Sequence, residues 1–378
     1  MRNLIAVLLT ASTVYAQDFP ESTPESQGLR SDTLCELSRH IRTEQHDIRS
    51  IVILRHGTLV FEWYAADVSR DHNHNLFSIT KSIVATLAGI AIDHGNIPST
   101  STTLGDVFPR SISDAAKGGV TLENLLTMRS GFPVSRANKT TGPERALFDR
   151  IQNVPDRLSM MLNDLPLDSP PGLEFEYNNI DPALVIAAIE ASCGQSALTF
   201  AKRHLFDPLG FENTAWIFSD EKKLVPGGYG LRLRAVDLAK MGQMYLQDGL
   251  WSGKHVVSSA WIQRSTSDAH GDGYGYFWWI DRGNQSYAAK GVRGQRLVIH
   301  PALDLVYVIL SDLPPEHVAA VTNNLGDNYI LKAVASDQSL PDDPEASQRL
   351  ADELKAAQDH LPETRRSLPP FRLPQNKS

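Results

Sequence analysis

Apolar residues recur along this chain with two different periods, and the change of period predicts where helices and strands lie. Behind the polar pair Ser31-Asp32, apolar side chains return every three or four positions, so a first helix is expected over residues 31–43. Residues 51–54 and 59–61 are two β-type runs around a His-Gly turn, which predicts a hairpin of two antiparallel strands.

A second helical pattern begins at Ser78 and stops at His94-Gly95, so Ser78 is expected at a helix N-terminus. Between about residue 96 and residue 284, helical periodicity alternates with Gly and Pro clusters, which is typical of a mainly helical subdomain. Three short β-type runs and a closing helix follow at residues 286–290, 295–300, 303–310 and 315–335.

This order of elements predicts an α/β (α+β) fold in which one five-stranded antiparallel sheet is flanked by helices and split by an inserted helical subdomain. The sheet domain would be discontinuous, with residues 17–95 and 285–336 on either side of the insertion at 96–284. Residues 337–378 carry many prolines and charges around one amphipathic stretch, and we expect a surface helix and a tail there. No βαβ repetition is present.

Composition narrows the classes of partner. The chain has 378 residues, 42% of them hydrophobic, which is enough for a sizeable core. Its formal net charge is -8, so it lacks the basic excess that nucleic acid binding requires. Cys35 and Cys193 are the two cysteines, and either one disulfide bridge or two buried thiols would fit the pattern. The oligomeric state stays open.

The N-terminus resembles an export signal. Arg2 precedes an apolar stretch, residues 4–9, and small residues end at Ala16. We expect a signal peptide over residues 1–16 that is cleaved after Ala16, which would make the mature protein periplasmic or secreted. The alternative is an apolar extension of the first helix. No later stretch approaches the ~20 apolar residues of a membrane-spanning helix.

The first candidate for chemistry is the Ser-x-x-Lys pattern at Ser78-Ile79-Thr80-Lys81. The spacing alone is weak, because composition produces it about once in a chain of this length. A second copy, residues 219–222, lies in a charged stretch typical of a solvated turn. At the start of an apolar helix, by contrast, residues three apart share a face, so Lys81 can reach the Ser78 hydroxyl. The helix N-terminus there offers free N–H groups to an oxyanion.

A catalytic role requires an unusual lysine. To accept a proton at neutral pH, Lys81 must have its pKa lowered by roughly three units, on the order of 4 kcal/mol, which calls for a desolvated pocket. Otherwise Ser78 merely caps the helix and Lys81 extends along its first turn.

Two further elements favour the catalytic reading. Tyr177-Asn178-Asn179 precedes a helix and places a Tyr and an amide two residues apart, on the same side of an extended chain. Such a Tyr can relay protons beside a Lys, although a half-buried core Tyr has the same signature. The segment from Ala289 to Val292, with Gly291 inside it, is a small-residue strand end whose backbone can donate an N–H to a substrate.

These three elements, in this order, resemble the serine β-lactamase and penicillin-binding protein superfamily. The closer resemblance is to the class C β-lactamase-related esterases and the 6-aminohexanoate-dimer (nylon oligomer) hydrolases. Further segments that look like this family, within a resemblance that spans about residues 25–335, are residues 121–132, 237–242 and 274–279.

The resemblance implies a β-lactamase/transpeptidase-like fold and assigns roles residue by residue. Ser78 would be the acylated nucleophile, Lys81 and Tyr177 the acid/base pair, and Asn179 the partner that orients Lys81 and the substrate. Backbone N–H groups of Ser78 and Val292, the latter after Gly291, would form the oxyanion hole. Neither a cofactor nor a metal is implied, and the substrate would be a small ester or amide.

The third motif departs from the family pattern, in which Lys or His is followed by Thr or Ser and then Gly. Here the sequence is Ala289-Lys290-Gly291, and alternation along a strand would point Lys290 to the opposite face. The cation that would bind a β-lactam carboxylate is therefore absent from its usual place, unless Arg129 or Arg293 replaces it. The departure favours an esterase or amidase.

Other readings stay open. A β-lactamase or D-amino-acid peptidase is the alternative enzyme, and a penicillin-recognising protein without turnover is the non-catalytic one. The alternating ligand types of residues 71–74 fit a polar loop better than a zinc site, since no further ligand cluster accompanies them. The aromatic run at residues 274–279 is expected to be mostly core, with one or two rings in a cleft. No Gly-x-Ser-x-Gly elbow exists.

Overall fold

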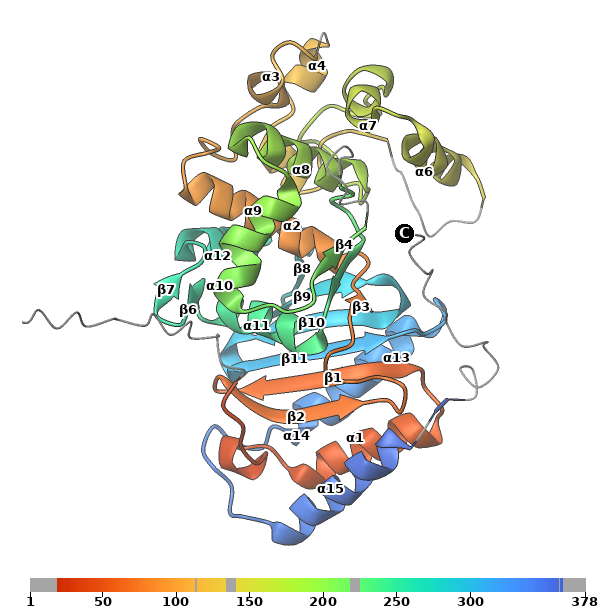
Figure 1. The fold of residues 1–378 in the computed structure, drawn as a ribbon, viewed down its shortest axis with the longest axis vertical. Coiled ribbons are helices and arrows are strands. Elements are labelled where there is room, and N and C mark those ends of the chain that lie inside the picture. The colour runs from red at the N-terminus through yellow and green to blue at the C-terminus, as the bar shows by residue number, and fades with distance from the viewer. Residues whose placement is uncertain (1–18, 113, 134–140, 218–224, 360, 363–378) are drawn as a thin grey trace, which may run out of the picture.

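A computed structural model of the chain describes residues 19–112, 114–133, 141–217, 225–359 and 361–362. The expected signal peptide (residues 1–16), the second Ser-x-x-Lys pattern (219–222) and most of the expected tail lie outside these residues. Figure 1 shows a sheet in the lower half of the molecule, a helical half above it, and helices α1 and α15 side by side beneath it.

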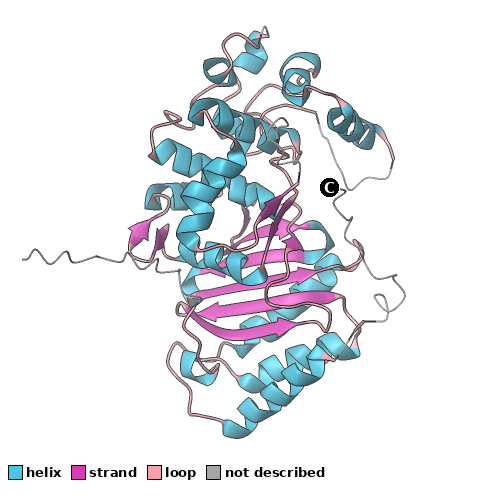
Figure 2. Cartoon of the chain, in the orientation of Figure 1, coloured by secondary structure: helices cyan, strands magenta, loops and turns pink. Residues whose placement is uncertain are grey.

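The main sheet has six antiparallel strands in the order β2-β1-β11-β10-β9-β8 (Figure 2). Its strands, in chain order, are β1 (Ile48–Arg55), β2 (Thr58–Tyr64), β8 (Trp279–Asp281), β9 (Ser286–Gly291), β10 (Gln295–His300) and β11 (Leu305–Ser311). Strand β1 pairs with β2 in the predicted hairpin and with β11 on its other side. The sheet therefore combines strands from both ends of the chain. This is the predicted fold, with one difference.

The sequence predicts five strands, and the sixth is β8 at the edge of the sheet. Only three residues long, it begins at the last residue of the aromatic run, Trp279, and lies within the range 96–284 that was expected to be the helical insertion. A strand of three residues has too few positions to show an alternating pattern.

Two hydrophobic cores lie on the two faces of the sheet. One face carries α1 (Ser31–Thr43), α13 (Val318–Leu325), the π-helical turn η6 (Gly326–Ile330), α14 (Leu331–Ala333) and α15 (Pro344–Gln358). The other face packs on α2 (Ile79–Asp93) and α11 (Ala235–Leu246), which are almost entirely buried. Helix α2 is apolar on all sides because it lies between the sheet and the helical half.

The helical half lies between α2 and β8 in the sequence, apart from α11, and most of its elements are short except α6 and α8. They are α3 (Leu104–Val107), α4 (Ala115–Gly118), α5 (Leu122–Leu126), α6 (Pro143–Asn153), α7 (Arg157–Ser159), η2 (Met160–Asp164), α8 (Ile180–Cys193), α9 (Ala197–Ala201), η3 (Lys202–Phe206), α10 (Asp207–Leu209) and α12 (Ser259–Ser265). Small sheets and turns complete the chain: η1 (Glu25–Gln27), β3 (His74–Asn75), β4 (Ala215–Trp216), β5 (Leu231–Leu233), β6 (Leu250–Trp251), β7 (Lys254–His255), η4 (Val292–Gly294) and η5 (Pro301–Leu303).

Two further details concern the cysteines and the apolar helices. Cys35 is buried in α1, Cys193 lies half-buried at the end of α8, and both thiols are free. In the described part of the chain, no single helix has the length and apolarity of a membrane span; only α8 together with the helical segment 197–209 does, and that pair bends by 79°.

Candidate active site

Ser78 stands at a sharp turn immediately before α2. The residue in front of it, Phe77, has a left-handed φ of 46°, which costs energy for a residue with a Cβ. The turn is held from both sides: the Phe77 N–H donates to Asn75 Oδ1 at 3.1 Å, and the Leu76 N–H donates to the Leu231 carbonyl at 3.0 Å. The half-buried Ser78 hydroxyl is thus fixed at the first turn of a rigid helix.

Lys81 lies one turn further along α2 and is 1% exposed. Its Nζ is 3.3 Å from Ser78 Oγ, 2.8 Å from Asn179 Oδ1 and 2.9 Å from the Gly228 carbonyl oxygen. The two oxygens accept N–H bonds, so a neutral amine that donates to both has its lone pair left for the Ser78 hydroxyl. This is the arrangement that a proton acceptor for Ser78 requires.

Burial lowers the pKa of Lys81 to about 7, whereas the nearby carboxylate of Asp181 acts in the opposite direction. The value lies in the range that the sequence argument demands of a base. Asp181 is itself fully buried, and desolvation raises the pKa of its carboxyl to about 7. It accepts a hydrogen bond from Ser130 Oγ through Oδ1, while its Oδ2 has no partner among the described residues.

Tyr177 closes the cluster from the side of the helical half. Its ring centroid is 4.8 Å from Lys81 Nζ. Two aromatic neighbours fix the ring, Trp279 at 5.7 Å and Tyr274 at 6.2 Å between centroids. Ser78, Lys81, Tyr177 and Asn179, which the sequence analysis selected from two distant segments, therefore meet in one place.

The end of strand β9 approaches the turn that carries Ser78. A Cβ at Gly291 would come within 2.6 Å of the Leu76 carbonyl oxygen, so only glycine permits this contact. Val292 follows at the surface, 39% exposed. The contact places the end of β9 against the turn before α2, so the two oxyanion-hole candidates, Ser78 and Val292, lie in neighbouring segments.

The cations near the third motif behave as the alternation of a strand requires. Ala289 is buried in the core on the α2 side, whereas the exposed Lys290 has its ammonium 5.6 Å from the ring centroid of Trp279. Arg129 is bound to Asp272 and to the Leu173 carbonyl at 2.7 Å, and Arg293 is bound to Asp312. Both arginines thus already have carboxylate partners.

Sequence reasoning missed Gly228 and Asp181. A Cβ at Gly228 would lie 2.6 Å from Asn179 Oδ1 and 3.2 Å from Lys81 Nζ, so the carbonyl reaches Lys81 only because no side chain is there. A Cβ on the neighbouring Gly227 would collide with the Pro182 carbonyl oxygen at 1.9 Å. Two adjacent glycines in a loop were the available signal for a close backbone approach.

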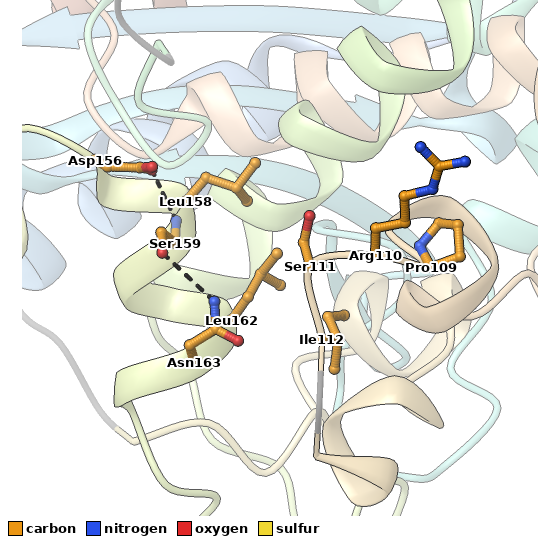
Figure 3. A pocket seen from close by; sticks show the side chains of 9 residues that line it. All are labelled: Pro109, Arg110, Ser111, Ile112, Asp156, Leu158, Ser159, Leu162 and Asn163. Atoms are coloured by element: carbon orange, nitrogen blue, oxygen red, sulfur yellow. Dashed lines mark hydrogen bonds between the residues drawn. The ribbon is translucent and has the colours of Figure 1, made fainter.

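One cavity in the described part of the chain lies away from this cluster. It has a volume of about 510 Å³ and opens in the helical half between the segment after α3 and the α7–η2 helices (Figure 3). Asp156 and Asn163 in its wall are bound to Ser159 in the helix, and none of the predicted site residues lines it. The candidate active site is therefore assigned from the arrangement of side chains around Ser78 and not from the size of a cavity.

Two smaller expectations concern residues 71–74 and 274–279. His74 is buried and its ring nitrogen is 2.8 Å from Ser50 Oγ. Within the described ranges no group of three or more His, Cys, Asp or Glu side chains is arranged as a metal site. The aromatic run is core apart from the half-buried Trp279, and Trp279 and Tyr274 are the two rings that contact Tyr177.

With this geometry in view, comparison with known proteins is decisive on one point. Residues 39–331 match the model of the β-lactamase family. The chain belongs to the β-lactamase family. A 6-aminohexanoate-dimer hydrolase from Paenarthrobacter ureafaciens is 26% identical over 334 residues, which cover 81% of this chain and 83% of that protein. The resemblance inferred from the motifs is thereby confirmed.

Solved structures of the family share the fold. A protein from Bacillus anthracis, provisionally described as a 6-aminohexanoate-dimer hydrolase, superposes with a TM-score of 0.71 at 19% identity, over 87% of this chain and 90% of that one. The octameric penicillin-binding protein homologue from Pyrococcus abyssi gives 0.61 at 20% identity, over 82% and 79%. EstCE1, a hydrolase with promiscuous acyltransferase activity, gives 0.63 at 16% identity, over 81% and 99%. The chain is a hydrolase of the β-lactamase fold.

Proposed function

We propose that this protein is a serine hydrolase that cleaves esters or small amides through an acyl-enzyme on Ser78. The observation that carries the proposal is the environment of Lys81: a fully buried amine, bound to two carbonyl-type oxygens and 3.3 Å from Ser78 Oγ. Burial lowers its pKa to about 7, so a large fraction of the amine is neutral at neutral pH. A surface Ser-Lys pair has neither property.

In the acylation step, Ser78 Oγ forms a bond to the substrate carbonyl carbon and loses its proton to Lys81 Nζ, directly or through the Tyr177 hydroxyl. Collapse of the tetrahedral intermediate breaks the bond to the leaving group, which takes that proton. Water then attacks the acyl-enzyme, gives its proton to the same base, and releases the acid while Ser78 Oγ recovers a proton. No other reactant is needed.

Two surrounding features support this chemistry. The N–H groups of Ser78 and Val292 would stabilise the oxyanion, an effect worth roughly 10²–10³-fold per donor. The buried Asp181 carboxyl lies near Lys81, and its ionised form favours the ammonium that forms as Ser78 is deprotonated. Neither group forms a bond to the substrate carbon.

The substrate class follows from the cations. Lys290 lies on the far side of its strand, and Arg129 and Arg293 are bound to carboxylates. A β-lactam carboxylate therefore has no uncompensated partner among these three, whereas a neutral ester or small amide needs none. The curated relative from Paenarthrobacter ureafaciens is named as a hydrolase of the 6-aminohexanoate dimer, which is consistent with an amide as the bond that is cleaved.

Parallel assays with p-nitrophenyl butyrate and nitrocefin test the proposal, with Ser78→Ala as the control for each. We expect turnover of the ester by the wild-type protein, little turnover of nitrocefin, and loss of both in the variant. Nitrocefin hydrolysis at comparable kcat/KM would instead identify a β-lactamase. Ester turnover that survives Ser78→Ala would refute the role of Ser78 altogether.

A further inference from the structure

A second polar cavity lies on the face of the sheet that Ser78 does not share. Its volume is about 170 Å³, and it is enclosed by the β8–β10 edge of the sheet on one side and by α13 and η6 on the other. Ala288 and Val298 in its wall belong to the core around α1 and α13, whereas their neighbours Ala289 and Leu297 belong to the core around α2. The cavity thus lies mainly across the sheet from the candidate active site, and the two share Trp279, whose ring centroid is 5.7 Å from that of Tyr177.

One end of this cavity holds two cations that face each other. Lys290 on β9 is directly opposite Arg296 on β10 in the strand register, an arrangement that is normally destabilising for like charges. Partial desolvation of its ammonium and repulsion by Arg296 lower the pKa of Lys290, whereas Asp281 acts in the opposite direction; burial lowers the pKa of Arg296. The Arg296 guanidinium donates to its neighbour's carbonyl, Gln295 O, and Lys290 lies over the Trp279 ring. Neither forms a salt bridge with a described carboxylate.

The next rung of the sheet is apolar. Trp279 on β8 pairs with Ala288 on β9, which in turn pairs with Val298 on β10. All three line the cavity. This rung offers contact to an alkyl chain and no hydrogen-bonding side-chain oxygen.

The opposite end of the cavity is rich in acceptors. Asp281 on β8 pairs with Ser286 on β9, and the buried His300 lies at the matching end of β10. Burial lowers the pKa of His300, which favours the neutral ring. The Asp327 carboxylate of η6 lies in the far wall. At about 3.3 Å per residue, the four-residue step from Lys290 to Ser286 separates the two ends by roughly 13 Å.

We propose that this cavity binds a short ω-amino acid, with its carboxylate between Lys290 and Arg296, its alkyl chain on the Trp279 rung, and its ammonium beside Asp281. The carboxylate of such a ligand relieves the repulsion between the two cations, and the acceptor-rich end suits an ammonium. The Lys290 ammonium lies 5.6 Å from the ring centroid of Trp279, one rung nearer to Asp281, so the ligand must bridge less than the backbone spacing. The inference rests on the strand register and does not depend on hydrolysis at Ser78.

Calorimetric titration of the full chain with 6-aminohexanoate tests the proposal, with hexanoate and hexylamine as probes that lack one charged end each. We expect 6-aminohexanoate to bind at least tenfold more tightly than either probe. Arg296→Gln should weaken binding at least tenfold, and Lys290→Gln should do the same if the first variant does not fold. Arg349→Gln is the control: Arg349 is a surface arginine on α15 that pairs with Asp32 of α1, and its loss should leave the affinity unchanged.

Three results would overturn the proposal: no binding of 6-aminohexanoate, equal binding of hexanoate, or equal affinity in Arg296→Gln and wild type. Ser78→Ala separates this site from the active site, because the affinity should persist in that variant. Loss of 6-aminohexanoate binding in Ser78→Ala would assign the ligand to the cleft and would also contradict the inference. The melting temperature gives a further test. Without ligand at low salt, the melting temperature of Arg296→Gln should be no lower than that of the wild type, because the substitution removes a contact between like charges.

Discussion

Lys81 and Lys290 lie on opposite faces of the same sheet edge and show how differently the fold can treat one residue type. Lys81 is enclosed by two oxygens and a hydroxyl, and burial lowers its pKa to about 7. Lys290 is exposed on its strand, lies over an indole ring and faces a second cation. The difference teaches that burial and the neighbouring hydrogen-bond acceptors, and not position in a family motif, decide which lysine can serve as a base.

The sharpest way to break this comparison is to remove the Lys81 amine. Lys81→Ala should lower kcat/KM for p-nitrophenyl butyrate by roughly 10³–10⁴-fold, the typical loss when a base is removed from a nucleophile. Steady-state kinetics measures the effect. Lys202→Ala, which removes an exposed lysine on η3, is the control and should stay within about twofold. A Lys81→Ala variant that retains most of the activity would show that Ser78 has another base.

A substitution at Tyr177 tests whether its hydroxyl carries the proton between Ser78 and Lys81. Tyr177→Phe keeps the ring that packs on Trp279 and Tyr274 and removes the hydroxyl, so only proton transfer is affected. We expect kcat to fall by about 10²–10³-fold with little change in melting temperature. Activity within fivefold of wild type would mean that Lys81 transfers both protons without help.

Gly228 tests the acceptor that the sequence analysis missed. Gly228→Ala would place a Cβ within 2.6 Å of Asn179 Oδ1 and 3.2 Å of Lys81 Nζ, so the cluster must shift. We expect about a 10²-fold loss of kcat/KM, because displacements of the order of an ångström misalign reacting groups. Gly118→Ala is the matched control, since its Cβ would meet nothing nearer than 3.9 Å. Equal kinetics in the two variants would contradict the geometry around Lys81.

A substitution at Asp181 should have the smallest effect on activity, and that effect should be a shift in its pH dependence. Its negative charge raises the pKa of Lys81, so Asp181→Asn should lower that pKa. Activity requires neutral Lys81 and rises as pH passes through its pKa, so the acid limb of the kcat/KM profile should move to lower pH in the variant. A pH profile from 5 to 9 measures it. A limb that does not move would exclude electrostatic coupling between the two groups.

An element could be predicted from the sequence where it was long enough to show a regular pattern of apolar and polar residues. Helices α1 and α2 and strands β1, β9, β10 and β11 have enough periodic positions to be predicted close to their observed bounds. Strand β8 was missed because three residues cannot show a period. The pairing of Ser78 with Lys81 follows from helical spacing, which is a local property.

The remaining parts of the site depend on contacts between distant segments. The Gly228 carbonyl meets Lys81 across 147 positions of sequence, and no local pattern around either residue encodes that contact. Asp181 lies in a helix, α8, that is apolar on all sides, and its carboxylate is unusual only when the burial is known. The lowered pKa of Lys81 likewise results from enclosure by the whole fold.

The central claim, that Ser78 carries the acyl group, can be tested most directly by mass spectrometry. The protein is quenched in acid during turnover of p-nitrophenyl butyrate, its intact mass is measured, and its peptides are mapped. The account predicts a butyryl adduct on the peptide that contains Ser78, absent from Ser78→Ala. An adduct on another residue, or full turnover by Ser78→Ala, would contradict it.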